Sequence, residues 1–231
     1  MKAVYASTVN HADPLAALAV GEQPEPQARP FWSTVSVRAV TVNHHDVWSL
    51  QGVGLAAEQT PMILGTDAVG ILDEDIPGKH GLKAGSEVVL YTFVGTDGAG
   101  VAPGERRTIL SEKYPGTMAE KTSVPSANVF AKPASLTTAE AAALGTSWLT
   151  AYSLLFDAAG IKPGDSVLIQ GAGGGVSTAA IQLAHTAGLE VFVTSRDADK
   201  RSKALKLGAN AALEIGARLP RKVDAVIESV G

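Results

Sequence analysis

Cysteine is absent from the 231-residue chain, which excludes disulfide bonds, thiolate zinc sites and cysteine nucleophiles. Basic residues are also scarce: 19 Lys and Arg stand against 23 Asp and Glu. A nucleic-acid partner usually requires a basic stripe, so this balance argues against one. No apolar run approaches the ~20 residues of a membrane span, and no targeting segment stands out. We therefore expect a cytoplasmic protein that binds neither nucleic acid nor membrane.

The first 130 residues show the sequence pattern of a β-rich domain. Val35, Val37 and Ala39 alternate with more polar residues, which is the period of a half-buried strand. Residues 86–91 form a second apolar run, and glycines separate such segments at short intervals. The sequence thus predicts an all-β domain over residues 1–130.

From residue 131 onward strands and helices alternate. Thr137 and Glu140 form a capping box at a helix start. Short apolar strands are predicted at 166–170, 191–194, 211–213 and 223–228, with helices at 176–187 and 199–207. This order predicts an α/β domain over 131–231, built on a doubly wound parallel (Rossmann) sheet. A complete sheet of this kind has six strands, so we expect the chain to be incomplete at its C-terminus.

A glycine-rich turn follows the strand at 166–170. Gly173, Gly174, Gly175 and Val176 lead into the next helix, where free amides bind a pyrophosphate if no side chain blocks its approach. Ser177 replaces the last glycine of the usual fingerprint. A purely structural turn also explains such a cluster, but its place between a buried strand and a helix favours dinucleotide binding.

The end of the second strand of this domain bears on the choice of cofactor. NAD enzymes place Asp or Glu there, ~20 residues beyond the glycines, to bind the ribose hydroxyls. Here the position holds Ser195, followed by Arg196 and then Lys200. A hydroxyl and two cations suit a 2′-phosphate, which favours NADPH over NADH. The alternative is that the two cations merely solvate a helix start.

The chain resembles the medium-chain dehydrogenase/reductase superfamily over its whole length. The segments that carry the resemblance are residues 40–48, 61–70, 116–120, 141–152 and the glycine turn. The resemblance implies a GroES-like catalytic domain ahead of the Rossmann domain.

The zinc-binding branch of that family differs from this sequence at the metal ligands. Asn43, Thr66 and Thr146 stand where the resemblance implies Cys, His and Cys, and only Asp67 keeps an acid. Residues 95–107 lack the cysteines of the family's structural zinc lobe. A site improvised around adjacent histidines is disfavoured, because neighbours on a strand point to opposite faces. We therefore expect no metal.

The zinc-free branches imply an oxidoreductase that passes hydride from NADPH to a quinone or an activated C=C bond of an enone or enoyl substrate. His45 occupies the place of the family's proton-relay hydroxyl and is the predicted proton donor, and Asn43 is predicted to orient the substrate carbonyl. His44 and Thr150 match cofactor-contacting positions. The histidines are equally explained as polar strand residues. The tyrosine acid of some enoyl reductases is missing, with Gly54 near its place.

Two other functions remain open at this stage. One is a non-catalytic nucleotide-binding or scaffold protein derived from the same fold. The other, disfavoured by the missing ligands, is a zinc alcohol dehydrogenase. In each case the expected partner is a small-molecule substrate or nucleotide, with a homodimer through the Rossmann sheet edge.

Overall fold

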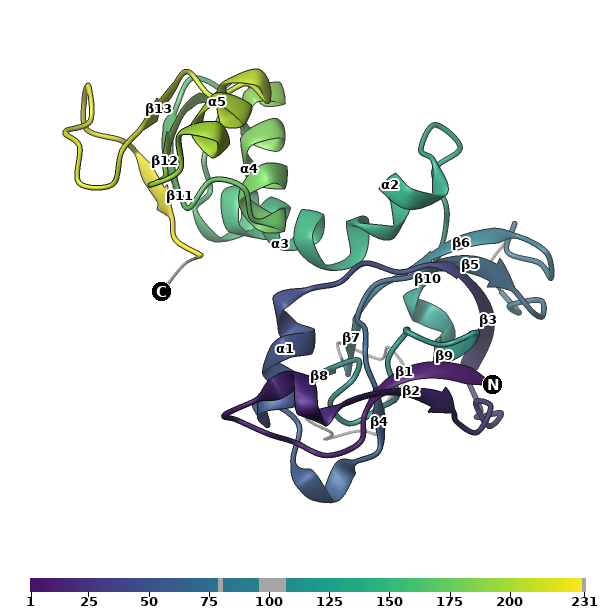
Figure 1. Cartoon of the computed structure of the whole chain (residues 1–231). Helices are drawn as coiled ribbons and strands as arrows, with labels where there is room; N and C mark the ends of the chain where they lie inside the picture. The colour runs from purple at the N-terminus through teal and green to yellow at the C-terminus, as the bar shows by residue number, and fades with distance from the viewer. Residues whose placement is uncertain (79–80, 96–106, 230–231) are drawn as a thin grey trace. The chain divides into compact units, whose positions relative to one another are not determined.

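The computed structural model describes residues 1–78, 81–95 and 107–229, so most of the lobe predicted at 95–107 lies outside the described residues. The chain divides into two compact units, Met1–Thr146 and Ser147–Gly231 (Figure 1). Within the described residues no helix has both the length and the apolar character needed to cross a bilayer.

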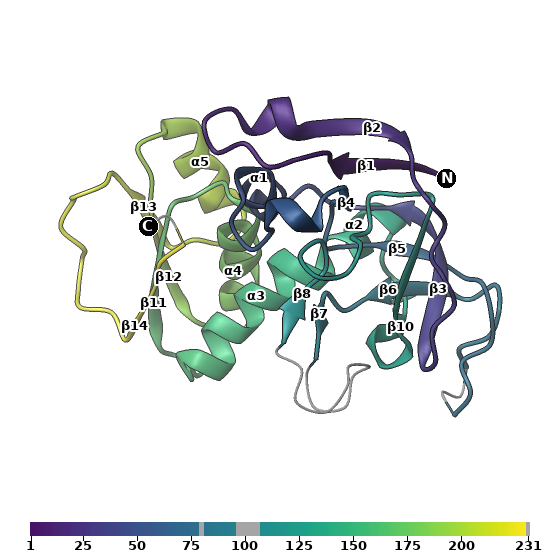
Figure 2. The same ribbon diagram turned by 90° about the horizontal axis from the view of Figure 1, so that it is seen from below.

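The first unit is β-rich, as the sequence predicts. One sheet has the order β10-β6-β5-β3-β9 and a second the order β2-β1-β4, and every pairing in them is antiparallel. Figure 2 shows β3, β5 and β6 side by side. The strands are β1 (Lys2–Ala6), β2 (Leu18–Glu22), β3 (Trp32–Ala39), β4 (Met62–Ile63), β5 (Val69–Leu72), β6 (Glu87–Leu90), β9 (Lys121–Pro125), β10 (Val129–Ala131) and the separate pair β7 (Phe93–Val94) and β8 (Thr108–Ile109).

The described residues of this unit form two α-helices and short 3-10 turns at Pro14–Ala17, Ala57–Gln59 and Ser126–Asn128. Helix α1 (His44–Gln51) follows β3, and helix α2 (Thr138–Ala142) starts at the predicted capping box, where the Thr137 amide donates to Glu140 Oε2 at 2.9 Å. Ala141 and Ala142 of α2 pack against Val69 of β5. Because of this packing the first unit extends to Thr146, while the domain boundary at 130 remains a prediction.

The helical run after α2 changes its hydrogen-bonding period twice. A π-helical segment at Leu144–Trp148 leads into α3 (Leu149–Tyr152), and a second follows at Ser153–Ala158. The sequence indicates helix here with a break at Gly145, but side-chain periodicity alone does not reveal π turns.

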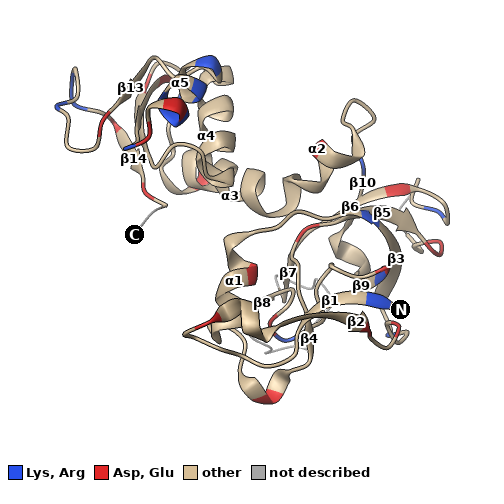
Figure 3. Ribbon diagram, in the orientation of Figure 1, with Lys and Arg blue, Asp and Glu red and all other residues tan. Residues whose placement is uncertain are grey.

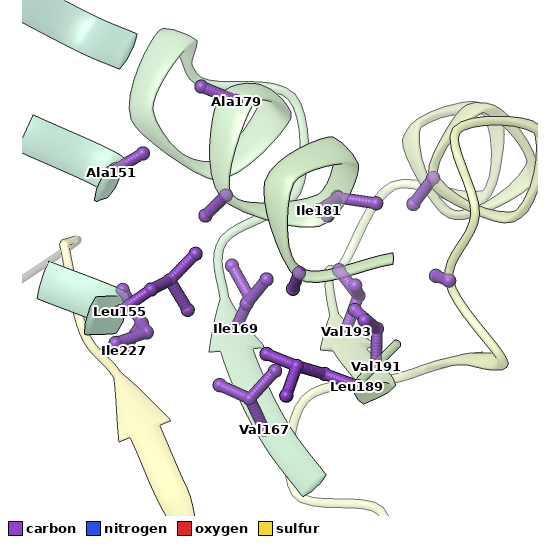
Figure 4. Packing of buried hydrophobic residues seen from close by; sticks show 14 of the residues in the cluster. Ala151, Leu155, Val167, Ile169, Ala179, Ile181, Leu189, Val191, Val193 and Ile227 are labelled. Atoms are coloured by element: carbon purple, nitrogen blue, oxygen red, sulfur yellow. The ribbon is translucent and has the colours of Figure 1, made fainter. Parts of the chain in front are cut away.

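The second unit is a parallel sheet in the order β13-β12-β11-β14. Its elements are β11 (Ser166–Gln170), α4 (Gly175–Thr186), β12 (Glu190–Thr194), α5 (Ala198–Lys206), β13 (Ala211–Leu213) and β14 (Ala225–Ile227). Alternate strand residues, among them Val167, Ile169, Val191 and Val193, share one core with α3, α4 and α5 (Figure 4). The predicted Rossmann topology is confirmed, because β12 and β13 lie on one side of β11 and β14 on the other.

Candidate functional site

A groove of about 840 Å³ lies at the carboxyl ends of β11 and β12 in the second unit. It opens beside the point where the strand order reverses, which is where parallel sheets of this kind bind ligands. Four of the predicted cofactor residues line it: Gly174, Ser195, Arg196 and Lys200. The fold therefore brings the glycine turn and the cationic positions to one groove.

Two glycines of the turn pack closely against side chains of the same unit. Gly173 has φ +97°, and a Cβ there would lie 2.8 Å from Lys200 Cδ. A Cβ on Gly175 would lie 2.7 Å from Ser147 Oγ. Ser177 tightens the turn, since its hydroxyl donates to the Gly171 carbonyl at 2.7 Å and accepts from the Gly174 amide at 3.1 Å.

The start of α4 offers amides to a ligand. The first N–H groups of a helix, here those of Gly175 and Val176, have no acceptor within the helix, and the helix dipole favours an anion beside them. These features suit the diphosphate of a dinucleotide.

The groove is lined by two cations, Arg196 and Lys200, and by two carboxylates, Asp197 and Glu228. Arg196 and Lys200 are exposed, and further basic residues follow along α5 (Figure 3). Asp197 also lines the groove, but its Oδ1 accepts from the amides of Asp199 and Lys200 and so caps α5. These backbone hydrogen bonds, led by the one from Lys200, lower the pKa of the Asp197 carboxyl. The Asp197 carboxylate is therefore held in place as the N-cap of α5.

Arg201, which the sequence did not single out, supports the groove without being one of its lining residues. Its Nη1 donates to the Ser195 carbonyl at 2.7 Å, and its Nη2 lies 3.1 Å from Glu214 Oε1. Arg201 thus fixes the backbone on which Ser195 sits. Thr150, predicted beside the nicotinamide, is half-buried on α3, in the same unit as the groove, and its role remains a prediction.

In the first unit a closed polar cluster surrounds Asp67. Its Oδ1 accepts from Thr146 Oγ1 at 2.6 Å, and its Oδ2 accepts from Asn43 Nδ2 at 2.8 Å and from the hydroxyl of Thr41. Asn43 Nδ2 also lies 3.1 Å from Thr66 Oγ1. Asp67 is fully buried, and burial raises the pKa of its carboxyl although the hydrogen bonds from Thr146, Thr41 and Asn43 act to lower it.

The Asp67 cluster contains all four positions at which the resemblance implies zinc ligands. The side chains that stand there do not suit zinc as ligands. Zinc in proteins prefers imidazole nitrogen and thiolate sulfur, with carboxylate oxygen as a further ligand. Here an amide and hydroxyl groups face a single carboxylate whose two oxygens already accept hydrogen bonds. Within the described residues no group of three His, Cys, Asp or Glu side chains is arranged to hold a metal ion.

The placement of His44 and His45 on a strand is wrong: they are the first two residues of α1. The helix begins here because Asp46 Oδ2 accepts from the Asn43 amide at 2.7 Å and Asp46 Oδ1 accepts from the Gly65 amide at 3.0 Å. Asp46 is buried, and burial raises the pKa of its carboxyl. It therefore braces α1, in agreement with a structural role for this residue.

The two histidines have different surroundings. His44 is exposed and meets Trp48 edge-on, with ring centroids 5.1 Å apart. The His45 side chain is 14% exposed, and its Nε2 lies 3.3 Å from Glu112 Oε1 while its Nδ1 lies 3.4 Å from Ser111 Oγ. Sequence reasoning missed Ser111 and Glu112, because nothing in their local pattern links them to a helix more than 60 residues earlier.

Comparison with known proteins supports this description of both units. A family model for the alcohol dehydrogenase GroES-like domain matches residues 29–134. The solved structure of an NAD-dependent alcohol dehydrogenase is 35% identical, with a TM-score of 0.82, and the match covers 94% of this chain and 64% of that one. The quinone oxidoreductase of Thermus thermophilus, also solved in complex with NADPH, is 29% identical, with a TM-score of 0.68, and the match covers 93% of this chain and 60% of that one.

Among curated proteins, the crotonyl-CoA carboxylase/reductase of Cereibacter sphaeroides is 31% identical, over 90% of this chain and 52% of its own length. The synaptic vesicle membrane protein VAT-1 homolog of Rattus norvegicus is 32% identical, over 70% of this chain and 35% of its own length. The chain thus spans about half, or less, of the length of these curated relatives.

Proposed function

The chain belongs to the medium-chain dehydrogenase/reductase superfamily, an oxidoreductase family, and from this we propose that it reduces a quinone or an activated C=C bond with NADPH and without zinc. The observation that carries the proposal is the groove of the second unit, in which a glycine turn faces Ser195, Arg196 and Lys200. The likeness to a quinone oxidoreductase and to a crotonyl-CoA carboxylase/reductase supports the substrate class.

Different residues of the groove would bind different parts of the cofactor. The amides at the start of α4 would hold the diphosphate, and the Ser195 hydroxyl with the two cations would hold the 2′-phosphate. Asp197 keeps its negative charge, so Arg196 and Lys200 would have to outweigh it, while the two amides that donate to its Oδ1 hold this carboxylate at the start of α5. The bound nicotinamide would supply hydride, and Thr150 and His44 are the proposed further contacts to the cofactor.

The first unit supplies the proton. No Lewis acid is needed to reduce an activated double bond, provided that the charge left on the substrate oxygen is stabilised and then protonated. We assign the protonation to His45. Asn43 is the proposed group for orienting the substrate carbonyl. On substrate binding, Asn43 Nδ2 would give up one of its hydrogen bonds within the Asp67 cluster and donate to the substrate instead.

The test is a titration of the purified chain with NADPH and with NADH, followed by nicotinamide fluorescence. We expect NADPH to bind more tightly, and the pair Arg196→Ala and Lys200→Ala to abolish that preference while Lys206→Ala, in the last turn of α5, leaves it intact. Absence of binding overturns the proposal. Binding without oxidation across a panel of quinones and enones favours the scaffold function instead.

A second measurement addresses the metal. We expect turnover to survive dialysis against a chelator, with no zinc in elemental analysis. Stoichiometric zinc whose removal abolishes turnover would contradict the zinc-free reaction.

A further inference from the structure

We propose that Glu112 is a positioning residue that holds the Nε2–H of His45, so that Nδ1 is the atom of this histidine that delivers a proton. The assignment of His45 as a proton donor rests on the proposed function, whereas the tautomer of its ring does not. The carboxylate lies 3.3 Å from Nε2, and the two side chains are 14% and 26% exposed. A carboxylate accepts and does not donate, so this contact places the proton on Nε2 of the neutral ring.

The structure builds a seat for this carboxylate. Glu112 Oε2 accepts from Thr108 Oγ1 at 2.9 Å and from the Ile109 amide at 3.4 Å, and the Glu112 carbonyl accepts from Gln59 Nε2 at 2.9 Å. Gly54 completes the seat: its φ is +77°, and a Cβ there would overlap Glu112 Oε1. Thr108, Ile109 and Gly54 therefore fix where the carboxylate stands, and Gln59 holds the Glu112 backbone.

The second ring nitrogen has an uncharged partner, and a hydrogen bond to a neutral hydroxyl is weaker than one to a carboxylate. Ser111 Oγ lies 3.4 Å from Nδ1, near the upper limit for a hydrogen bond, and the Ser111 side chain is buried. A hydroxyl can donate or accept, so it tolerates Nδ1 with or without a proton. Nδ1 is thus the nitrogen that can exchange its present partner for a substrate oxygen or a bridging water.

The proton balance follows from this arrangement. The doubly protonated ring keeps Nε2–H on Glu112 and releases Nδ1–H to the substrate anion that hydride addition leaves behind. One N–H bond breaks, one bond to hydrogen forms on the substrate, and the ring becomes neutral in its Nε2–H form. A proton from a hydronium ion or a buffer acid then returns to Nδ1, so each turnover consumes one proton from the solvent.

The tautomer can be measured on the protein itself. Long-range ¹H–¹⁵N correlation spectra of the intact chain, recorded where His45 is neutral and assigned with His45→Gln, distinguish a protonated Nε2 from a protonated Nδ1. We expect Nε2–H in the wild type, in Ser111→Ala and in Glu112→Gln, since the glutamine carbonyl still accepts. Glu112→Leu has no acceptor, and we expect a mixture of tautomers, with Glu58→Leu on an exposed turn as the matched control.

Two results would overturn the proposal: Nδ1–H in the wild type, or a tautomer that changes in Ser111→Ala and not in Glu112→Leu. Circular dichroism of each variant shows whether the fold is retained, and Glu112→Met, which also lacks the carboxylate, replaces the leucine variant if that variant unfolds. In turnover we expect Glu112→Leu to lower kcat by about 10- to 100-fold with little change in KM, and Glu112→Gln to recover most of it. If the spectra show Nε2–H but no turnover is found with any substrate, the proposed function fails and the assignment of Glu112 stands.

Discussion

Ser195 is the residue at which the proposed preference for NADPH over NADH is tested most directly. Its buried hydroxyl stands at the end of β12, held by the Asp197 amide and backed by Arg201 on its carbonyl. Ser195→Asp adds a carboxylate where the 2′-phosphate is proposed to bind. A lost charge-assisted hydrogen bond costs about 1.5–3 kcal/mol. We expect the Kd for NADPH to rise roughly ten- to hundredfold, with that for NADH unchanged or lower, as measured by fluorescence titration.

The control for this substitution is Ser202→Asp, which adds the same charge at an exposed position of α5 that does not line the groove. An equal loss of NADPH affinity in both variants would show that net charge, and not the position of Ser195, sets the preference.

Asp67 makes stability depend on pH in a predictable direction. Burial raises the pKa of its carboxyl above the ordinary value of 3.8, so the folded state binds a proton that the unfolded chain has lost. Its stabilisation is complete below that value and is lost as pH rises through the folded pKa. Over this window the free energy of unfolding falls by about 1.4 kcal/mol per pH unit for this one group.

The variant Asp67→Asn lacks this titration. We expect the difference in unfolding free energy, wild type minus Asp67→Asn, to decrease as pH rises above 3.8, as measured by urea unfolding at a series of pH values. Parallel pH curves for the two proteins would mean that Asp67 binds its proton equally in both states. Asp46, whose pKa burial also raises, is present in both proteins; the Asp67 charge raises the pKa of Asp46 further, so its loss in Asp67→Asn changes the difference in the same direction.

At the scale of elements, the sequence predicted the second unit well because its signals are local. β11 and β13 have the predicted bounds, and β12 differs by one residue. Short apolar runs closed by glycine leave few alternatives to buried strands. Helix α1 was missed because the apolar residues before it continue the strand pattern. Its start depends on Asp46 bridging the Asn43 and Gly65 amides, and the second of these contacts is long-range.

The contact between α4 and the segment before α3 gives a test of the glycine turn. Gly175→Ala would gain helix propensity, worth up to about 1 kcal/mol. It would also place a Cβ 2.7 Å from Ser147 Oγ, and such overpacking typically costs about 1–3 kcal/mol. We expect Gly175→Ala to be less stable than wild type in urea unfolding. We expect Ser147→Ala with Gly175→Ala to recover that loss, because the overlapping hydroxyl is gone.

We expect NADPH affinity to stay reduced in the double variant even though its stability is recovered. The added methyl group still narrows the approach to the helix amides, so we expect the double variant to bind NADPH more weakly than Ser147→Ala alone. Equal affinity would show that Gly175 serves packing and not the cofactor.

At the scale of the whole molecule, the sequence could not show which residues from distant segments come into contact. The resemblance marked Asn43, Thr66, Asp67 and Thr146 one by one, and only the fold shows that they hydrogen-bond into one cluster. Glu112 meets His45 across 67 residues through a seat whose partners share no motif. Loop closure at that distance is set by the packing of the β-rich unit, which no local pattern records.

The edge of the parallel sheet gives the last test. Among the described residues, β14 pairs with β11 on one side only, and its Val226 side chain is 52% exposed. An unpaired strand edge is a template for pairing with another chain, and a charged side chain there prevents it. We expect the chain to form a homodimer in sedimentation equilibrium and Val226→Lys to shift it to monomer. Leu205→Lys, at a similarly exposed position on α5, should leave the dimer unchanged, whereas a wild-type monomer at every concentration would refute pairing through this edge.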